Sequence, residues 1–385
     1  MSPWDAIAAA SFGIWLYLMF GRGGFWREGV LPAAPAPTRW PNVIAVVPAR
    51  NEATFIGEAL RSLLSQDYPG EFSVVLVDDH SSDGTAERAR EAAEAIGAGE
   101  RLRILQARSL PAGWTGKMWA LSEGIDAIER SAAANSTHPE LILLTDADIV
   151  HHVTNLRELA ARIESGVDLA SLMVKLRAET LAERFMIPAF VFFFEMLYPF
   201  SWIRDPAKRT AGAAGGCVLV RREVLRRIGG IEALRGEIID DCALGRAAKE
   251  GGPIWLGLSG ETRSLRPYPA LGDIWRMVAR TAYAQLGYSP LVLLATVLGL
   301  ALAFVAPVAI SLSGTESATL GVVAWAAMVL AFLPTLRLYE RSPVWAPLLP
   351  VIAVVYMAAT IDSARRHWIG KGSEWKGRIQ QPSRA

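Results

Sequence analysis

Predicted strands that end in acidic residues constrain the fold of this chain more than any other feature of its sequence. Four short runs are predicted strands: Asn42–Val47, Phe72–Val77, Arg103–Gln106 and Leu141–Thr145. The first lacks polar alternation, as expected of a parallel strand covered on both faces. Helical patterns lie between the strands, at residues 53–65, 83–95 and 119–131. This alternation predicts right-handed βαβ units and an α/β, Rossmann-like fold with a mostly parallel sheet.

Four acidic motifs appear in a fixed order: Pro48–Glu52, Val77–Thr85, Thr145–Asp148 and Glu237–Asp241. The first three each close a predicted strand. Carboxylates at the C-terminal ends of parallel strands lie in the crevice where open α/β sheets bind ligands. This arrangement suits a nucleotide and a divalent metal, so the sequence indicates an enzyme that handles a nucleotide-activated substrate.

Asp146 and Asp148 are the centre of the predicted site, one residue apart where the strand Leu141–Thr145 ends. Their hard oxygen ligands suit Mg²⁺ or Mn²⁺, which would also hold substrate phosphates. An isolated Asp-x-Asp pair is a weak signal, because such pairs occur often on surfaces. Its position directly after a buried strand, in series with the other motifs, makes it a specific one.

Three further acids and a lysine are candidates for the donor site. Asp78 and Asp79 close the second strand, and such carboxylates can accept hydrogen bonds from a uracil ring or ribose hydroxyls. Asp83 either shares that role or caps the next helix. Lys117 is a candidate counter-charge for a diphosphate leaving group, although a single lysine is more often a solvated surface residue.

The segment Gly212–Cys217 is rich in small residues, which would let backbone approach a bound sugar or acceptor closely, or would simply form a tight turn. Asp240 and Asp241 stand at the start of a predicted helix, 242–249. Adjacent acids there favour the helix dipole. Beside a metal and a hydroxyl acceptor, one of them could instead be a general base.

The net charge and the cysteine spacing exclude nucleic-acid binding through a basic field and a CxxC metal site. The formal net charge of +1 gives no basic field that would attract nucleic acid. The chain has two cysteines, Cys217 and Cys242, without the CxxC spacing of a metal site. We therefore expect reduced, structural thiols in a cytoplasmic domain.

Apolar segments at both ends of the chain predict membrane helices. Trp4–Phe20 is just long enough to span a bilayer. Because Arg22, Arg27 and Arg39 follow it, the positive-inside rule places the middle of the chain in the cytoplasm.

Three more candidate spans follow in the C-terminal part: Pro290–Leu312, Leu320–Leu336 and Val344–Ile361. Three crossings would leave the basic tail outside, against the same rule. Either Val344–Ile361, which contains Pro347 and Pro350, is re-entrant, or an earlier segment does not cross. We expect a cytoplasmic tail.

Phe185–Trp202 is also strongly apolar, but Glu195 lies near its centre. A spanning helix would bury that charge at a cost of a few kcal/mol. The segment is therefore either an interfacial helix that enters one leaflet or a buried core helix.

The ordered motifs, over roughly residues 40–280, resemble the family 2 glycosyltransferases with a GT-A fold. The resemblance implies an inverting transfer of a sugar from a nucleotide diphosphate donor, usually UDP-linked. It implies that Asp146 and Asp148 form the metal site, with Asp148 as the direct ligand. It also implies that Asp241 is the catalytic base beside Asp240, which replaces the family's usual glutamate.

With the residues above, the predicted donor site comprises Pro48, Arg50, Asn51, Glu52, Asp78, Asp79, Lys117 and Asp146. Gly215 and Gly216 fall where the family's acceptor-side glycines lie. The chain departs from processive members, because the region Trp275–Tyr283 lacks their Gln-x-x-Arg-Trp motif. Arg276 and Arg280 in that region are candidate diphosphate contacts.

The chain has an N-terminal anchor, the run Arg-Thr-Ala-Tyr-Ala-Gln at residues 280–285 and C-terminal membrane segments. This layout resembles the hopene-associated glycosyltransferases of bacterial hopanoid pathways. It is also similar to carotenoid and ceramide glycosyltransferases, whose tails share the Trp-Lys-Gly-Arg signature found at Trp375–Arg378. The expected function is therefore single-sugar transfer from a UDP-sugar to a lipid hydroxyl at the cytoplasmic face of the bacterial inner membrane. The alternatives are a polysaccharide synthase and a catalytically idle membrane scaffold.

The predicted domains follow from these features. They are an N-terminal membrane anchor (1–21), a linker (22–41), a GT-A domain (42–285) with a candidate interfacial helix (185–202), C-terminal membrane helices (286–362) and a basic tail (363–385).

Overall fold

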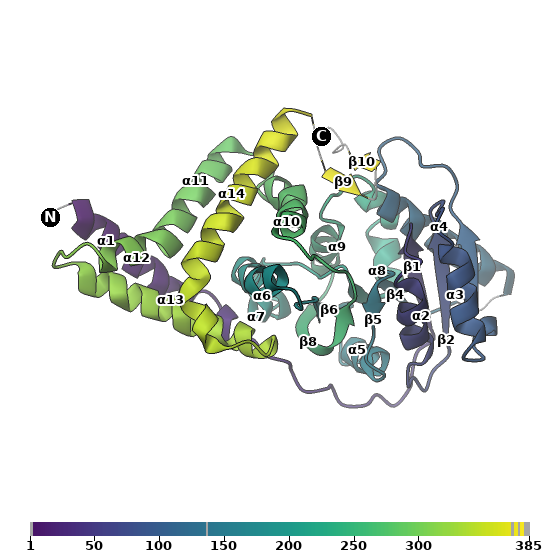
Figure 1. Cartoon of the computed structure of the whole chain (residues 1–385). Coiled ribbons are helices and arrows are strands. Elements are labelled where there is room, and N and C mark those ends of the chain that lie inside the picture. The colour runs from purple at the N-terminus through teal and green to yellow at the C-terminus, as the bar shows by residue number, and fades with distance from the viewer. Residues whose placement is uncertain (1–2, 136–137, 371–372, 376–377, 381–385) are drawn as a thin grey trace. The chain divides into compact units, whose positions relative to one another are not determined.

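The structure of the chain is a computed structural model that describes residues 3–135, 138–370, 373–375 and 378–380 (Figure 1). It contains two compact units. The helical unit consists of the residues up to Gly29, Arg177–Ser201 and Pro267–Ser373. The sheet unit consists of Val30–Leu176, Trp202–Arg266 and the residues from Glu374. Residues 177–201 and 267–285, which the sequence assigns to the GT-A domain, thus pack with the helical unit.

The sheet unit is built on one eight-stranded sheet with the order β3-β2-β1-β4-β7-β6-β8-β5. Its strands are β1 (Val43–Ala49), β2 (Phe72–Asp78), β3 (Leu102–Gln106), β4 (Leu141–Thr145), β5 (Ile149–Val150), β6 (Leu169–Lys175), β7 (Cys217–Arg221) and β8 (Ile254–Ser264). The first four strands are parallel, at the predicted positions. β7 runs antiparallel to both of its neighbours, β4 and β6, so the sheet is mixed beyond β4.

The sheet carries helices on both faces. The helices of this unit are α2 (Ile56–Leu64), α3 (Thr85–Glu94), α4 (Gly116–Asn135), α5 (Asn155–Glu164), α8 (Arg222–Arg227) and α9 (Asp240–Lys249). α2, α3 and α5 share a core with alternate residues of β1, β2, β4 and β6, such as Val43 and Val47. α4 packs on the opposite face, beside Val46 and Val77. The predicted helices are confirmed, with ends that differ by a few residues.

The helical unit contains α1 (Pro3–Leu16), α6 (Leu181–Leu197), α10 (Leu271–Gln285), α11 (Pro290–Leu300), α12 (Ala306–Ser311), α13 (Ala318–Leu338) and α14 (Leu349–Trp368). α7 (Phe200–Arg204) crosses the boundary between the units. Four helical segments of the described chain are long and apolar enough to cross a membrane: Trp4–Gly21, Pro290–Ser311, Ala318–Leu338 and Pro343–Trp368. They coincide with the four predicted spans. Pro347 and Pro350 lie before α14 and in its first turn, so they do not interrupt that helix.

α6 is buried among the other helices of the helical unit. Its central residues, including Phe192 and Glu195, are buried, and the Glu195 carboxylate lies 3.5 Å from the Thr335 hydroxyl of α13. Arg22 donates hydrogen bonds from Nε and Nη2 to the carbonyls of Met196 and Leu197, each at 3.0 Å, and so caps the C-terminal end of α6. The interpretation of residues 185–202 as a buried core helix predicts this burial.

The C-terminal tail forms a short pair of strands, β9 (Ser373–Trp375) and β10 (Arg378–Gln380). The signature Trp375–Arg378 includes Lys376 and Gly377, which lie outside the described residues. The side of the membrane on which the tail lies stays a prediction.

Gly124 allows α4 to lie close to the sheet, and its replacement tests this packing. A methyl group at Gly124 would lie 2.5 Å from Val46 Cγ1 and 3.0 Å from Val77 Cγ2, both buried. We expect Gly124→Ala to lower the free energy of unfolding by about 1–3 kcal/mol, measured by thermal unfolding of the full chain in detergent.

Gly57→Ala in α2 is the matched control for this substitution. The nearest atom, Arg61 Nη1, would lie 3.6 Å from the added methyl group, which is an ordinary contact. Since alanine favours a helix, we expect the control to be neutral or stabilising. Equal unfolding midpoints for Gly124→Ala and the unaltered protein would contradict the close approach of α4 to the sheet.

Candidate active site

The first two motifs are fastened to each other at the ends of β1 and β2. The Asn51 N–H donates to Ser81 Oγ at 3.0 Å, and Asn51 Oδ1 accepts from the Ser82 N–H at 2.9 Å. Arg50 Nη1 donates to the Asp79 carbonyl at 2.6 Å. Asn51 has a φ of 51°, a left-handed conformation that asparagine tolerates better than most residues. The two loops therefore form one rigid polar edge.

Asp78 and Asp79 of the second motif are buried within this edge, and Asp83 is exposed. Asp79 is fully buried, with Arg50 Nη1 at 3.7 Å from its Oδ2. Asp78 Oδ1 accepts from the Ser81 N–H at 3.1 Å. Asp83 accepts from the backbone N–H groups of Ala53 and Thr85, at 3.0 and 3.1 Å. Asp83 thus joins the first loop to the start of α3, although the N-cap position of that helix is Gly84 and has no side-chain cap.

The two acids of the third motif point to different surroundings. Asp146 is 36% exposed, and its Oδ1 lies 3.0 Å from Lys117 Nζ. The side chain of Asp148 is only 7% exposed, and its Oδ2 accepts from Ser264 Oγ and from Arg266 Nε, both at 3.0 Å. The spacing of the motif thus brings one acid to an accessible edge and buries the other against β8.

Arg266 joins the first and third motifs, and sequence reasoning missed it. Its guanidinium donates to Glu52 Oε1 at 2.6 Å as well as to Asp148. Arg266 follows β8 by two residues and no local motif marks it. The only signal available in the sequence was a basic residue that could pair with the acids of the site.

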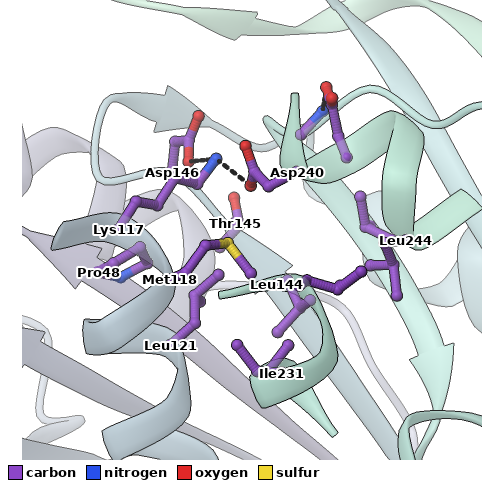
Figure 2. A pocket seen from close by; sticks show the side chains of 14 residues that line it. Pro48, Lys117, Met118, Leu121, Leu144, Thr145, Asp146, Ile231, Asp240 and Leu244 are labelled. Carbon is purple, nitrogen blue, oxygen red and sulfur yellow. Dashed lines mark hydrogen bonds and ion pairs between the residues drawn. The ribbon is translucent and has the colours of Figure 1, made fainter. Parts of the chain in front are cut away.

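Lys117 lies in the first turn of α4 and bridges two of the predicted motifs (Figure 2). Its Nζ is 3.0 Å from Asp146 Oδ1 and 3.4 Å from Asp240 Oδ2. Burial alone would lower the pKa of Lys117, but the carboxylates of Asp146, Asp240 and Asp241 together raise it above its ordinary value. Lys117 is therefore a permanent positive charge inside an acidic cluster.

Asp241 is held by backbone donors at the start of α9. Its Oδ2 accepts from the Gly215 N–H at 2.8 Å, and its Oδ1 accepts from the Cys242 N–H at 2.7 Å. Burial, reinforced by the charge of Asp240, raises the pKa of Asp241 to about 6, against the opposing effect of Lys117 and the two N–H groups. A carboxylate with a pKa near neutrality suits proton transfer.

Glycine is required at position 215, because the backbone there lies close to the side chains of Asp241 and Lys117. A Cβ atom on Gly215 would lie 3.2 Å from Asp241 Oδ2 and 3.3 Å from Lys117 Nζ. Both contacts are tighter than is usual for a Cβ atom, so a side chain would displace the acid, the amine or both. The small residues at 212–217 thus have a structural requirement at one position at least.

These side chains converge on one pocket of the sheet unit (Figure 2). Its polar lining comes from Lys117, Thr145, Asp146, Asp240 and Asp241. The remaining lining is apolar apart from Gly215, and it consists of Pro48, Met118, Leu121, Leu144, Val218, Ile231, Leu234 and Leu244. The pocket therefore combines a charged side with an apolar one.

The predicted metal residues fit a cation that is shared with a substrate. Asp146 and Asp148 supply hard carboxylate oxygens, but no group of three or more His, Cys, Asp or Glu side chains that could hold a metal occurs in the part of the chain that the structure describes. Mg²⁺ is commonly bound by one or two carboxylates together with substrate phosphates. A cation on Asp148 would share that carboxylate with Arg266.

The predicted residues thus fall into three groups. Pro48, Lys117, Asp146, Gly215, Asp240 and Asp241 line the pocket, and Gly216 adjoins it in the chain. Arg50, Asn51, Glu52, Asp78, Asp79 and Asp148 belong to the polar edge and its ion pairs. Arg276 and Arg280 lie on α10 of the helical unit, where Arg276 pairs with Asp273, and their contact with a diphosphate stays a prediction.

Comparison with solved structures identifies the fold. A mannosyltransferase from Pyrobaculum calidifontis, in complex with GDP-mannose and Mn²⁺, matches with a TM-score of 0.58 and 21% identity, over 94% of this chain and 98% of the other. Glucosyl-3-phosphoglycerate synthase from Mycobacterium tuberculosis, in complex with Mn²⁺, UDP-glucose and glycerol 3-phosphate, has a TM-score of 0.38 and 21% identity, over 64% of this chain and 80% of the other. The first likeness confirms the predicted GT-A-like fold.

Sequence comparison identifies the family. Among curated proteins, none matches this chain. The profile described as glycosyltransferase like family 2 matches residues 41–283, which is more than half of the sequence. The chain therefore belongs to glycosyltransferase family 2, whose members transfer a sugar from a nucleotide-sugar donor.

Proposed function

We propose that this enzyme moves one sugar from a nucleoside diphosphate donor to a hydroxyl group on a membrane lipid. The observation that supports this proposal most directly is the pocket in which Lys117, Asp146 and Asp241 lie beside an apolar lining. The charged side suits a sugar diphosphate and its proton transfer. The lipid part of the proposal rests on the four helical segments of the described chain that are long and apolar enough to cross a membrane.

Asp241 is the proposed general base. Its ionised carboxylate takes the proton of the acceptor hydroxyl while the hydroxyl oxygen attacks the anomeric carbon. The bond between that carbon and the diphosphate oxygen breaks, and the diphosphate leaves with the bonding electrons. The N–H groups of Gly215 and Cys242 fix the orientation of the carboxylate. Attack opposite to the leaving group inverts the anomeric centre, as the family resemblance implies.

Lys117 is the proposed counter-charge of the departing diphosphate, since its ammonium lies at the charged side of the pocket. Asp146 and Asp240 hold it there. Asp146 and Asp148 would hold Mg²⁺ or Mn²⁺, which would supply further positive charge against the leaving group. Arg50, Asn51, Glu52, Asp78 and Asp79 form the edge on which we place the nucleoside.

The membrane part of the proposal has its own support. Four helical segments of the described chain are long and apolar enough to cross a bilayer. Because Arg22, Arg27 and Arg39 follow the first of them, we place the sheet unit at the cytoplasmic face of the bacterial inner membrane. A hopanoid-type acceptor, or another polyisoprenoid or sphingolipid-like one, is the finer proposal that the layout resemblance favours.

A donor and acceptor panel tests the function. Purified protein in detergent is mixed with UDP-sugars or GDP-mannose, Mn²⁺ or Mg²⁺, and extracted bacterial lipids, and nucleotide release is measured. We expect release that needs one donor and one lipid fraction and that stops when the metal is chelated. The family resemblance favours UDP-sugars, while the relative from Pyrobaculum calidifontis was solved with GDP-mannose.

Each other outcome of this panel has a defined meaning. Release with the donor alone, accompanied by a lengthening glycan, would support a polysaccharide synthase. Transfer to a water-soluble acceptor in preference to every lipid would contradict the lipid proposal. Failure to release nucleotide from any donor would favour the scaffold alternative.

Replacement of the proposed base separates chemistry from donor binding. Because the amide of Asp241→Asn cannot accept the proton, we expect kcat to fall by about 100- to 10,000-fold with little change in the Kd of the nucleoside diphosphate. Kinetics and calorimetric titration measure the two quantities. Asp126→Asn, on the exposed side of α4, is the control and should change neither. An active Asp241→Asn protein would remove Asp241 from the mechanism.

The pH dependence of transfer gives an independent test. The pKa of Asp241 is raised to about 6, so the carboxylate is ionised above that pH and protonated below it. We expect kcat to be constant above pH 7 and to fall about tenfold per pH unit below the pKa. A kcat that stays constant down to pH 4 would contradict the assignment.

The folding stability changes with pH in the opposite direction to kcat. The pKa of Asp241 is higher in the folded chain than in the unfolded chain, so the stability that Asp241 contributes at low pH is lost as the pH rises towards 6.

A further inference from the structure

A buried chain of side-chain hydrogen bonds lies directly beneath the pocket. Asn155 Nδ2 lies 3.0 Å from His151 Nδ1, and His151 Nε2 lies 3.0 Å from Thr145 Oγ1. Thr145 Oγ1 in turn donates to the Gly216 carbonyl at 2.8 Å. The side chains come from α5, the residue after β5 and the end of β4, so the chain of bonds connects three elements of the sheet unit.

The partners fix the direction of every bond in this chain. A carbonyl oxygen can only accept, so the Thr145 hydroxyl hydrogen points to Gly216. The Thr145 oxygen must then accept, and His151 Nε2 must carry a hydrogen. The amide nitrogen of Asn155 can only donate, so His151 Nδ1 must be bare. The imidazole is therefore neutral and held in the Nε2–H tautomer.

The surroundings reinforce that state. Thr145, His151 and Asn155 are each less than 5% exposed. Burial lowers the pKa of His151 to about 4, so the ring is uncharged at neutral pH. Asn155 Nδ2 also lies 3.5 Å from the Cys217 sulfur, which is the residue after Gly216. Gly216 and Cys217 are thus both held by the same network.

This network ends on the two loops that carry the proposed chemistry. Thr145 directly precedes Asp146, and the Asp146 N–H approaches the Gly216 carbonyl at 3.4 Å. The neighbouring Gly215 N–H is the donor to Asp241 Oδ2. A change in the position of the Gly216 backbone would therefore move both Asp146 and Asp241. His151 could thus influence both acids, even though its own side chain does not line the pocket.

We propose that His151 is a positioning residue that ties the turn bearing Asp146 to the glycine loop that orients Asp241. It acts through Thr145 and Gly216 and does not contact substrate. The catalytic consequence rests on the proposed function, because it needs Asp241 to be the base. The tautomer and the hydrogen-bond chain do not rest on it.

The first experiment reads the hydrogen bonds directly. Full-length protein labelled with ¹⁵N-histidine is studied in detergent by NMR, with His151→Gln used to assign the signal among the five histidines. We expect one neutral imidazole at pH 7 with its hydrogen on Nε2. Thr145→Val, which removes the hydroxyl but keeps the shape, should shift that signal and leave the other histidines unchanged. An Nδ1–H tautomer, or a signal that Thr145→Val does not move, would overturn the chain.

The second experiment measures the catalytic effect, with UDP-glucose and GDP-mannose as donors and Mn²⁺ as the metal. We expect His151→Leu to lower kcat for nucleotide release by about 10- to 100-fold, as is common for residues that orient a site from behind it, with KM for the donor nearly unchanged. His151→Gln can still donate to Thr145 from its amide, so it should keep most of the activity. The double variant with Thr145→Val should be no worse than His151→Leu alone, because both break the same chain.

His152→Gln is the matched control, since this adjacent histidine contacts Thr154 and Glu261 and is 38% exposed. If His151→Leu does not fold, Thr145→Val with Thr145→Ser as its rescue replaces it. Full activity in the folded His151→Leu or Thr145→Val protein would overturn the positioning role. If the unaltered protein releases no nucleotide, the proposed function fails for these donors, and the imidazole signal still decides whether the chain exists.

Discussion

The site depends on one cation, Lys117, because it lets three aspartates share a small space. Its ammonium lies 3.0 Å from Asp146 and 3.4 Å from Asp240, and its charge opposes the rise in the pKa of Asp241. Two like charges 4 Å apart repel by about 4 kcal/mol at an effective dielectric constant of 20. Without Lys117 the acids would have to separate or take up protons. With it, Asp241 can be an ionised carboxylate at neutral pH and still hold a proton in slightly acidic conditions.

The second requirement of the site is that the loops between helices and strands are held in accurate positions. The loops after β1 and β2 fasten to each other through Asn51 and its serine partners. The loop after β4 and the glycine segment before β7 are joined through Thr145. Gly215 then brings its N–H within 2.8 Å of Asp241. The geometry of the candidate site is therefore set by side chains beneath the pocket as much as by those that line it.

Arg266 shows how the polar edge is stabilised. Glu52 and Asp148 are both almost completely buried, and an ionised carboxylate is costly to bury without a partner. The guanidinium donates to one oxygen of each acid, and it thereby fixes the first motif against the third. A metal ion bound to Asp148 would share that carboxylate with Arg266. Metal binding would therefore change the ion pair between Arg266 and Asp148.

The sequence by itself determined the elements that depend on local pattern. Runs of buried residues located β1, β2 and β4, helical periodicity located α2, and long apolar segments located all four candidate spans. It also determined which strand ends carry acids, because that is a matter of neighbouring residues. The tertiary structure alone decided the reversal of strand direction at β7, the burial of α6 in the helical unit, and the partners of Glu52, Asp148 and Thr145. Arg266 is more than 200 residues from Glu52 in the chain, and Gly216 is 71 residues from Thr145. Such contacts follow from how strands and helices pack in space, and no local periodicity encodes them.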